Sequence, residues 1–149
     1  MGLTIIREAR LSDVDRVTEL FDLLNVDAIP WEYRLTPIYV RALVERRQCY
    51  IAQIGGNTVG AIHVRPVVFR GLEVESISVD PAFQGRGVGT LLMRHAATVA
   101  VETYGANRLL VGSQDDYDAA EFYLRIGMEE ISDRAHNPNA RFFQQQLDT

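Results

Sequence analysis

Residues 79–90 have the sequence Val-Asp-Pro-Ala-Phe-Gln-Gly-Arg-Gly-Val-Gly-Thr, and this stretch decides the fold. A β-branched segment ends at Asp80-Pro81, and glycines then lead into an apolar segment with helical periodicity. Glycine allows the backbone to adopt unusual dihedral angles and to approach a ligand closely. Consecutive N–H groups at a helix N-terminus attract anions, and the helix dipole strengthens this attraction. The stretch therefore predicts a turn whose backbone, with a charged contact from Arg86, binds a pyrophosphate.

Two common pyrophosphate-binding patterns do not fit this glycine turn (residues 84–90). The dinucleotide fingerprint needs glycine at its first, third and sixth positions directly after a strand, but the sixth position counted from Gly85 is Thr90. The P-loop needs a lysine, and all 15 basic residues of the chain are arginines. The lack of lysine also excludes a pyridoxal Schiff base. A glycine-rich turn that serves only helix–strand packing stays open as the structural alternative.

The pattern Gln-x-x-Gly-x-Gly does fit, with Gln84, Gly87 and Gly89 after a Val-x-Pro strand end. It resembles the coenzyme A-binding motif of the GCN5-related N-acetyltransferase (GNAT) family. This family uses acetyl-CoA to acetylate amines, so the resemblance implies an acetyl-CoA-dependent N-acetyltransferase.

A second motif supports the same resemblance. The family pattern Asn-x-x-Ala-x-x-Phe-Tyr-x-x-x-Gly-Phe is similar to residues 116–128, where Phe122 and Tyr123 match. Met128 replaces the final Phe, which is a conservative apolar change. Asp116 replaces the Asn, and an ionised Asp accepts hydrogen bonds but does not donate them.

Periodicity and turn residues predict the order β-α-α-β-β-β-α-β-α-β-β in one domain over residues 1–149, a mixed α/β (α+β) sheet with helices on its faces. Ser12 and Thr36 are the predicted N-caps of the first two helices. Gly55-Gly56-Asn57 indicates a hairpin, and Gly71 indicates another turn. This order is similar to the GNAT fold from first strand to last. In that fold, the strands here predicted at residues 72–79 and 108–112 splay apart at their carboxyl ends.

The family resemblance also implies where acetyl-CoA binds. Its pantetheine arm lies between the splayed strands and pairs with the backbone of the first one. The cofactor-binding residues carried over in this way are Ile77, Ser78, Val79, Gln84, Gly85, Arg86, Gly87, Val88, Gly89, Thr90 and Asp116.

Acetyl transfer needs a group that takes a proton from the amine and a group that protonates the leaving thiolate. Glu73 and Glu75 lie two residues apart on one predicted strand and hence on one face, so each is a candidate base; Glu75 is preferred slightly because it is closer to the acetyl group. Water-mediated transfer and a purely solvent-facing role stay open. Tyr123 aligns with the family's general acid, with Tyr117 as a weaker substitute, and a core tyrosine is the alternative.

The acceptor of the acetyl group is not identified by the sequence. Trp31, Glu32 and Tyr33 lie in the loop where the family builds its acceptor pocket, and they offer a carboxylate and ring faces to a cation. Trp31 as a cover for the core is the equal alternative. We expect a small-molecule or peptide amine as partner, and a homodimer is an option because family members often dimerise.

Composition excludes several other classes of protein. A net charge of −5 and a pI of about 5.2 argue against a nucleic-acid binder with a basic face. Cys49 is the only cysteine, so an internal disulfide and a thiolate metal cluster are excluded and a reducing cytoplasm is expected. His63, His95 and His136 lack metal-ligand spacing, so no metal is expected. No apolar run is long enough to span a membrane.

Two other functions stay open at this point. The first is a non-catalytic acyl-CoA-binding or regulatory module of the same fold, which acetyl-CoA turnover with a panel of amines would distinguish from an enzyme. The second is an unrelated nucleotide-binding domain, which a thermal-shift comparison of coenzyme A with NAD and ATP would distinguish.

Overall fold

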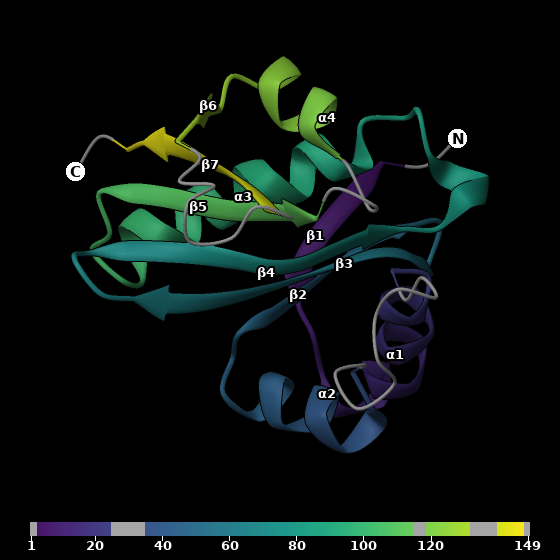
Figure 1. The fold of residues 1–149 in the computed structure, drawn as a ribbon. Coiled ribbons are helices and arrows are strands. Elements are labelled where there is room, and N and C mark those ends of the chain that lie inside the picture. The colour runs from purple at the N-terminus through teal and green to yellow at the C-terminus, as the bar shows by residue number, and fades with distance from the viewer. Residues whose placement is uncertain (1–2, 25–34, 115–118, 132–139, 148–149) are drawn as a thin grey trace. The chain divides into compact units, whose positions relative to one another are not determined.

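The computed structural model describes residues 3–24, 35–114, 119–131 and 140–147 (Figure 1). Its elements follow the predicted order, with short 3-10 turns at Leu11–Asp13 and Pro81–Phe83 in addition. The strands are β1 (Thr4–Glu8), β2 (Cys49–Ile54), β3 (Asn57–Val67), β4 (Gly71–Val79), β5 (Arg108–Gln114), β6 (Glu129–Glu130) and β7 (Ala140–Gln146). The helices are α1 (Val14–Asp22), α2 (Pro37–Glu45), α3 (Val88–Glu102) and α4 (Ala120–Arg125).

The strands form a mixed sheet of seven strands in the order β1-β2-β3-β4-β5-β7-β6, which confirms the predicted fold class. β4 and β5 are parallel and pair from Gly71 with Arg108 to Val74 with Val111. This ladder ends before either strand does, as expected for strands that separate at their carboxyl ends. β5 pairs antiparallel with β7, and β1 pairs antiparallel with β2.

The chain forms two compact units. The first comprises residues 1–64 and 76–95, and the second comprises residues 65–75 and 96–149. β3, β4 and α3 each run through both units. A single acetyltransferase domain over residues 1–149 stays a prediction.

The core of the first unit forms where α1 and α2 pack together. Val17, Leu20 and Phe21 recur at helical spacing on α1 and are fully buried. They cluster with Val40 and Leu43 of α2 and with residues of β2 and β3. The predicted start of α2 is confirmed, since the Thr36 hydroxyl accepts a hydrogen bond from the Tyr39 N–H and Pro37 opens the helix.

The entry into α1 differs from the prediction that Ser12 caps it. Asp13 stands at the N-cap position of α1, but its side chain makes no capping bond to this helix. Its carboxylate instead closes the preceding 3-10 turn, where it accepts a hydrogen bond of 2.8 Å from the Arg10 N–H. The Arg7 guanidinium donates two further bonds to the same carboxylate, at 2.8 and 3.2 Å. An aspartate that receives an arginine fork and a backbone N–H fixes the turn more firmly than a serine hydroxyl would.

The hairpin turn between β2 and β3 is confirmed, with Gly55 and Gly56 at φ +57° and +82°. The turn predicted at Gly71 is wrong in its position. Phe69 and Arg70 adopt positive φ angles of 61° and 59° instead, and Gly71 already belongs to β4. A Cβ on Gly71 would lie 3.0 Å from the Val67 side chain, so glycine is needed there for close packing rather than for the turn.

The second unit has its own core beside β5. Leu72 and Val74 of β4 and Leu109 and Val111 of β5 are buried at alternate positions, so they share one face of the sheet. Phe143 of β7 is fully buried as well. The opposite face of β4 carries Glu73 and Glu75, which are the predicted base candidates.

Candidate active site

The glycine turn follows β4 and leads into α3, as predicted. The Asp80 carboxylate accepts a hydrogen bond of 2.9 Å from the Ala82 N–H, and the Asp80 N–H donates to the Val59 carbonyl at 2.8 Å. The Gln84 side-chain amide donates to the Val79 carbonyl at 3.2 Å. The side chain of Gln84, a predicted cofactor residue, therefore braces the turn.

Gly85 and Gly87 are needed for the backbone conformation of the turn. Their φ angles are +79° and +81°, a region that side-chain-bearing L residues rarely adopt. An added Cβ on either glycine would meet no other atom within 4 Å, and both residues are exposed. The alternative that these two glycines serve only helix–strand packing is therefore not supported. Their open surface leaves room for a ligand to approach the backbone.

Gly60 of β3, which was not predicted from the sequence, lets α3 approach the sheet. A Cβ at this position would lie 3.1 Å from the side chains of Val88 and Leu92 and 3.3 Å from the Ser78 carbonyl. The first turn of α3 therefore packs directly on the backbone of β3. An isolated glycine inside a strand pattern is the available signal for such a close approach.

The remaining predicted cofactor residues of the first unit differ in exposure. The Ser78 hydroxyl is buried and donates a hydrogen bond of 2.6 Å to the Leu20 carbonyl of α1, so this side chain supports the fold. Val88 is buried in the core, and Arg86 is exposed, with its guanidinium 5.1 Å from the centre of the Phe83 ring. Ile77, Val79, Gly89 and Thr90 are partly buried.

Glu73 and Glu75 lie on one face of β4, as predicted, and one arginine contacts both carboxylates. Arg65 Nε lies 2.6 Å from Glu75 Oε1, and Arg65 Nη2 lies 3.6 Å from Glu73 Oε2. Burial and the charge of Glu75 raise the pKa of Glu73 above its ordinary value, while Arg65 opposes this shift. Arg65 was not predicted from the sequence, where its only signal is an arginine in the mainly apolar second half of β3.

Tyr123, the predicted general acid, belongs to α4 and is 4% exposed. Its ring centre lies 5.4 Å from those of Phe122 and Phe143. The ring is therefore part of the core of the second unit, and the catalytic role of its hydroxyl stays a prediction. The other predicted residues Trp31, Glu32, Tyr33, Asp116 and Tyr117 lie outside the described residues.

The surroundings of Cys49, His63 and His95 indicate structural roles for these residues. Burial, together with the charge of Asp13, raises the pKa of Cys49 to about 12, so its thiol is protonated at neutral pH. His63 and His95 pack their rings edge to face with Tyr39 and Tyr50. In the described ranges, no three His, Cys, Asp or Glu side chains gather as metal ligands.

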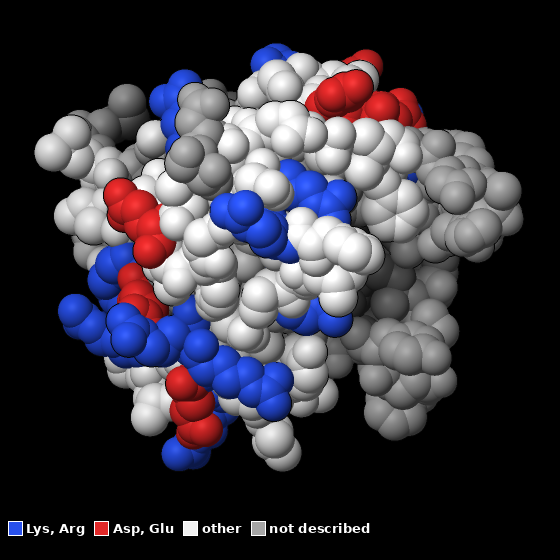
Figure 2. All heavy atoms as spheres, turned by 90° about the vertical axis from the view of Figure 1, so that its left-hand side faces the viewer, with Lys and Arg blue, Asp and Glu red and all other residues white. Residues whose placement is uncertain are grey.

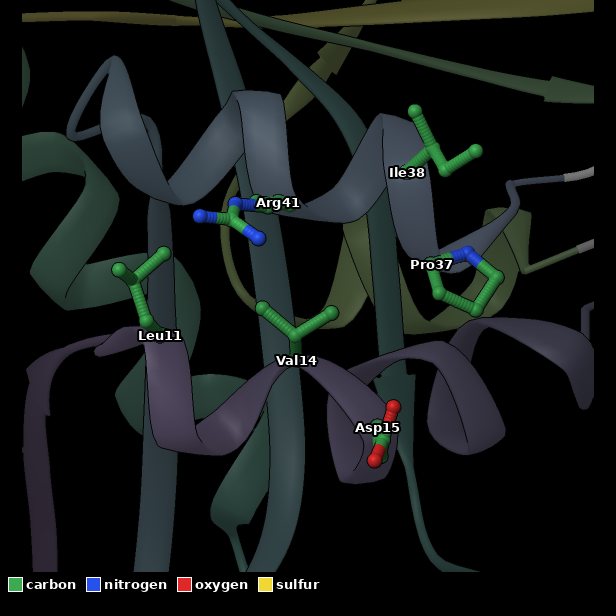
Figure 3. Close-up of a pocket in the computed structure, with 6 residues that line it drawn as sticks. All are labelled: Leu11, Val14, Asp15, Pro37, Ile38 and Arg41. Carbon is green, nitrogen blue, oxygen red and sulfur yellow. The ribbon is translucent and has the colours of Figure 1, made fainter.

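A hollow of about 380 Å³ lies between the start of α1 and the start of α2 (Figure 3). Leu11, Val14, Pro37 and Ile38 form apolar walls, and Asp15 and Arg41 supply its charged groups. Among the described residues, none that was predicted from the sequence to bind the cofactor or to catalyse the reaction lines this hollow.

On the face drawn in Figure 2, basic and acidic side chains lie next to one another instead of forming a continuous basic surface. No helix within the described ranges combines the length and the apolar character that a membrane crossing needs.

Comparison with known proteins identifies the family. The model of the acetyltransferase (GNAT) family matches residues 15–128. The chain is 31% identical over 125 residues to the N-alpha-acetyltransferase RimI of Mycobacterium tuberculosis, covering 80% of this chain and 75% of that protein. It is 25% identical over 144 residues to an N-alpha-acetyltransferase of Sulfurisphaera tokodaii, covering 88% and 83%.

A solved structure shares the fold over its whole length. The PaiA N-acetyltransferase of Thermoplasma acidophilum, in complex with coenzyme A, superposes with a TM-score of 0.82 at 12% identity and covers 97% of this chain and 99% of that one. The family match spans both sequence motifs, the glycine turn and the segment around Tyr123. The chain therefore belongs to the acetyltransferase (GNAT) family and is an N-acetyltransferase.

Proposed function

We propose that this protein transfers the acetyl group of acetyl-CoA to a primary amine by direct attack in a ternary complex, and that the amine is the α-amino group of a peptide or protein. The observation that carries the cofactor assignment is the glycine turn. Gly85 and Gly87 present open backbone at positive φ angles, directly before the N-terminus of the 15-residue helix α3.

The chemistry of this turn fits a pyrophosphate. The first N–H groups of a helix have no acceptor within the helix, and the helix dipole favours an anion beside them. Leu91 makes the first bond of α3, to the Gly87 carbonyl at 3.1 Å, so the N–H groups before it are the donors of this turn. Arg86 is exposed beside them and adds positive charge. Bound acetyl-CoA supplies the thioester that the amine attacks.

We assign the two proton transfers of the reaction to residues of the second unit. A carboxylate of β4 takes one proton from the acceptor's ammonium, directly or through water. The nitrogen then attacks the thioester carbonyl carbon, a C–N bond forms and the C–S bond breaks. Tyr123 protonates the leaving thiolate, and the second proton of the nitrogen returns to Tyr123 through solvent. The products are the amide, the free thiol and one proton.

The choice of an α-amine follows from the two relatives named as N-alpha-acetyltransferases. An α-amino group has an ordinary pKa of about 8, against about 10 for lysine, so less basicity is needed to release its proton. The same relatives give no support to a non-catalytic module. A reducing cytoplasm and a homodimer stay predictions.

Matched peptides test this function. One peptide has a free N-terminus and no lysine, and its partner has the same sequence with a blocked N-terminus and one internal lysine. We expect free-thiol release with acetyl-CoA for the first peptide and at most slow release for the second. Calorimetry with coenzyme A runs in parallel. Binding without turnover of any amine would contradict the enzymatic proposal, and faster turnover of the lysine peptide would contradict the α-amine.

A further inference from the structure

The ion pairs between β3 and β4 in the second unit are unequal. The contact from Arg65 Nε to Glu75 Oε1, at 2.6 Å, is a charge-assisted hydrogen bond. The contact from Arg65 Nη2 to Glu73 Oε2, at 3.6 Å, is longer than a hydrogen bond. The Glu73 and Glu75 side chains are 28% and 30% exposed, so neither is fully hydrated. The Arg65 guanidinium therefore contacts both carboxylates and lies closer to that of Glu75.

The basic side chains nearest to this pair on β5 and on β3 have contacts of their own. On β5, Leu110 pairs with Glu73, and Arg108 lies two residues before it. The Arg108 guanidinium donates to the Val68 carbonyl at 3.3 Å. On β3 the nearest other titratable residue is His63, two positions before Arg65, and its ring contacts Tyr39. Arg65 is therefore the cation that the described contacts place on these carboxylates.

We propose that Arg65 sorts the two carboxylates of β4, so that Glu75 stays an anion in the ion pair and Glu73 is the group that takes the proton from the acceptor amine. This proposal rests on the acetyltransferase function proposed above, and it reverses the slight preference for Glu75 that the sequence suggested. Arg65 acts through Glu75 and Glu73 and is a positioning residue.

The physical reason is the cost of two neighbouring negative charges. Two carboxylates that share a site repel each other, so one of them binds a proton more readily than it would alone. The carboxylate that holds the cation keeps its charge. Burial and the Glu75 charge raise the pKa of Glu73, which moves this group toward the range in which a base can take a proton from an amine.

Kinetics with the free-N-terminus peptide test the assignment. Glu73→Gln should lower kcat by roughly 10²-fold or more, and the acid limb of the pH–rate profile should move up toward the pKa of the free amine, about 8. Glu75→Gln removes a charge that raises the pKa of Glu73, so the acid limb should remain and move to lower pH. Arg65→Gln removes the opposing charge, so the limb should move to higher pH, and Arg65→Lys should restore it in part. A purely structural role of Arg65 predicts no such movement.

Carboxyl ¹³C NMR titration separates this proposal from the proposed function, because it needs no substrate. In the parent, the pKa of Glu73 should lie above its ordinary value, and Glu75→Gln should lower it. If the pKa of Glu73 lies at or below its ordinary value, or if Glu75→Gln moves the acid limb toward the pKa of the free amine while Glu73→Gln leaves it in place, the proposal is wrong. If the NMR result holds but no amine is acetylated, the sorting stands and the proposed function fails.

Discussion

Arg16 of α1 holds Asp80 at the end of β4, with 2.7 Å between Nη2 and Oδ2. The same guanidinium donates to the Thr58 carbonyl at 3.0 Å and to Glu19 at 3.1 Å. The other oxygen of Asp80 accepts from the Ala82 N–H. This backbone bond and the Arg16 contact lower the pKa of Asp80 below its ordinary value. Arg16 thus connects α1 to the segment between β4 and the glycine turn.

Arg16→Met should therefore loosen the turn and weaken acetyl-CoA binding. We expect the KM for acetyl-CoA to rise several-fold, with a smaller change in kcat, because Arg16 shapes the turn and takes no part in proton transfer. Steady-state kinetics at saturating acceptor measure the KM for acetyl-CoA and kcat separately. Arg41→Met, which breaks the exposed ion pair of Arg41 with Glu45 on α2, is the matched control. Equal KM values for both variants would show that the Arg16 contact does not position the turn.

Gly87→Ala should separate the conformational role of the glycine turn from general destabilisation. Alanine at a φ of +81° costs about 1–2 kcal/mol in the folded state, and its Cβ stands where the ligand would approach. Gly105→Ala is the control, since Gly105 has a φ of +61° and an equally open surface after α3. Both variants should lose similar thermal stability, but only Gly87→Ala should lose coenzyme A affinity in calorimetry. Unchanged affinity in a folded Gly87→Ala protein would place the cofactor elsewhere.

The sequence predicted the order of elements because local signals determine it. The Gly55-Gly56 hairpin, the Thr36-Pro37 helix start and the glycine turn each depend on residues within a few positions of one another. Where the prediction failed, the deciding partner is remote in sequence or the residue is unusual for its conformation. Gly71 is fixed by packing against Val67 and Arg108, and Phe69 adopts an angle that is rare for a bulky residue.

In the candidate site as well, residues in short motifs could be predicted and residues with remote partners could not. Gly85, Gly87 and the pair of glutamates come from short motifs and could be predicted. Gly60 and Arg65 could not, because their roles depend on α3 and β4, which approach them only in the folded chain. Charge sorting between Glu73 and Glu75 depends on a one-ångström difference between two contacts, and no sequence pattern encodes that difference.

Asp13→Asn should destabilise the protein in a pH-dependent way. Burial raises the pKa of Asp13, but the bonds from Arg7 and from the Arg10 N–H outweigh it and lower the pKa below its ordinary value of 3.8. A lowered pKa in the folded state contributes stability above pH 3.8, and this contribution is lost as the pH falls through the folded-state value.

The free energy of unfolding of Asp13→Asn should accordingly be about 1–3 kcal/mol lower than that of the parent at pH 7. The difference should shrink as the pH falls below the ordinary value of 3.8 and then through the lower pKa of the folded state. Urea unfolding across this pH range measures it. Asp15→Asn, in the first turn of α1 and outside the Arg7 contact, is the control and should change little. A constant difference down to pH 2 would show that the charge of Asp13 is not the cause.

Tyr123→Phe removes one oxygen and keeps the ring that packs against Phe143. If the hydroxyl protonates the leaving thiolate, kcat should fall by roughly 10²-fold or more while acetyl-CoA affinity and melting temperature stay close to the parent's. Tyr104→Phe, in the turn after α3, is the control and should keep full activity. An acetyl donor with a better leaving thiolate should restore much of the lost rate in Tyr123→Phe, because such a thiolate needs no acid. A kcat within a factor of about three of the parent's would make Tyr123 a packing residue only.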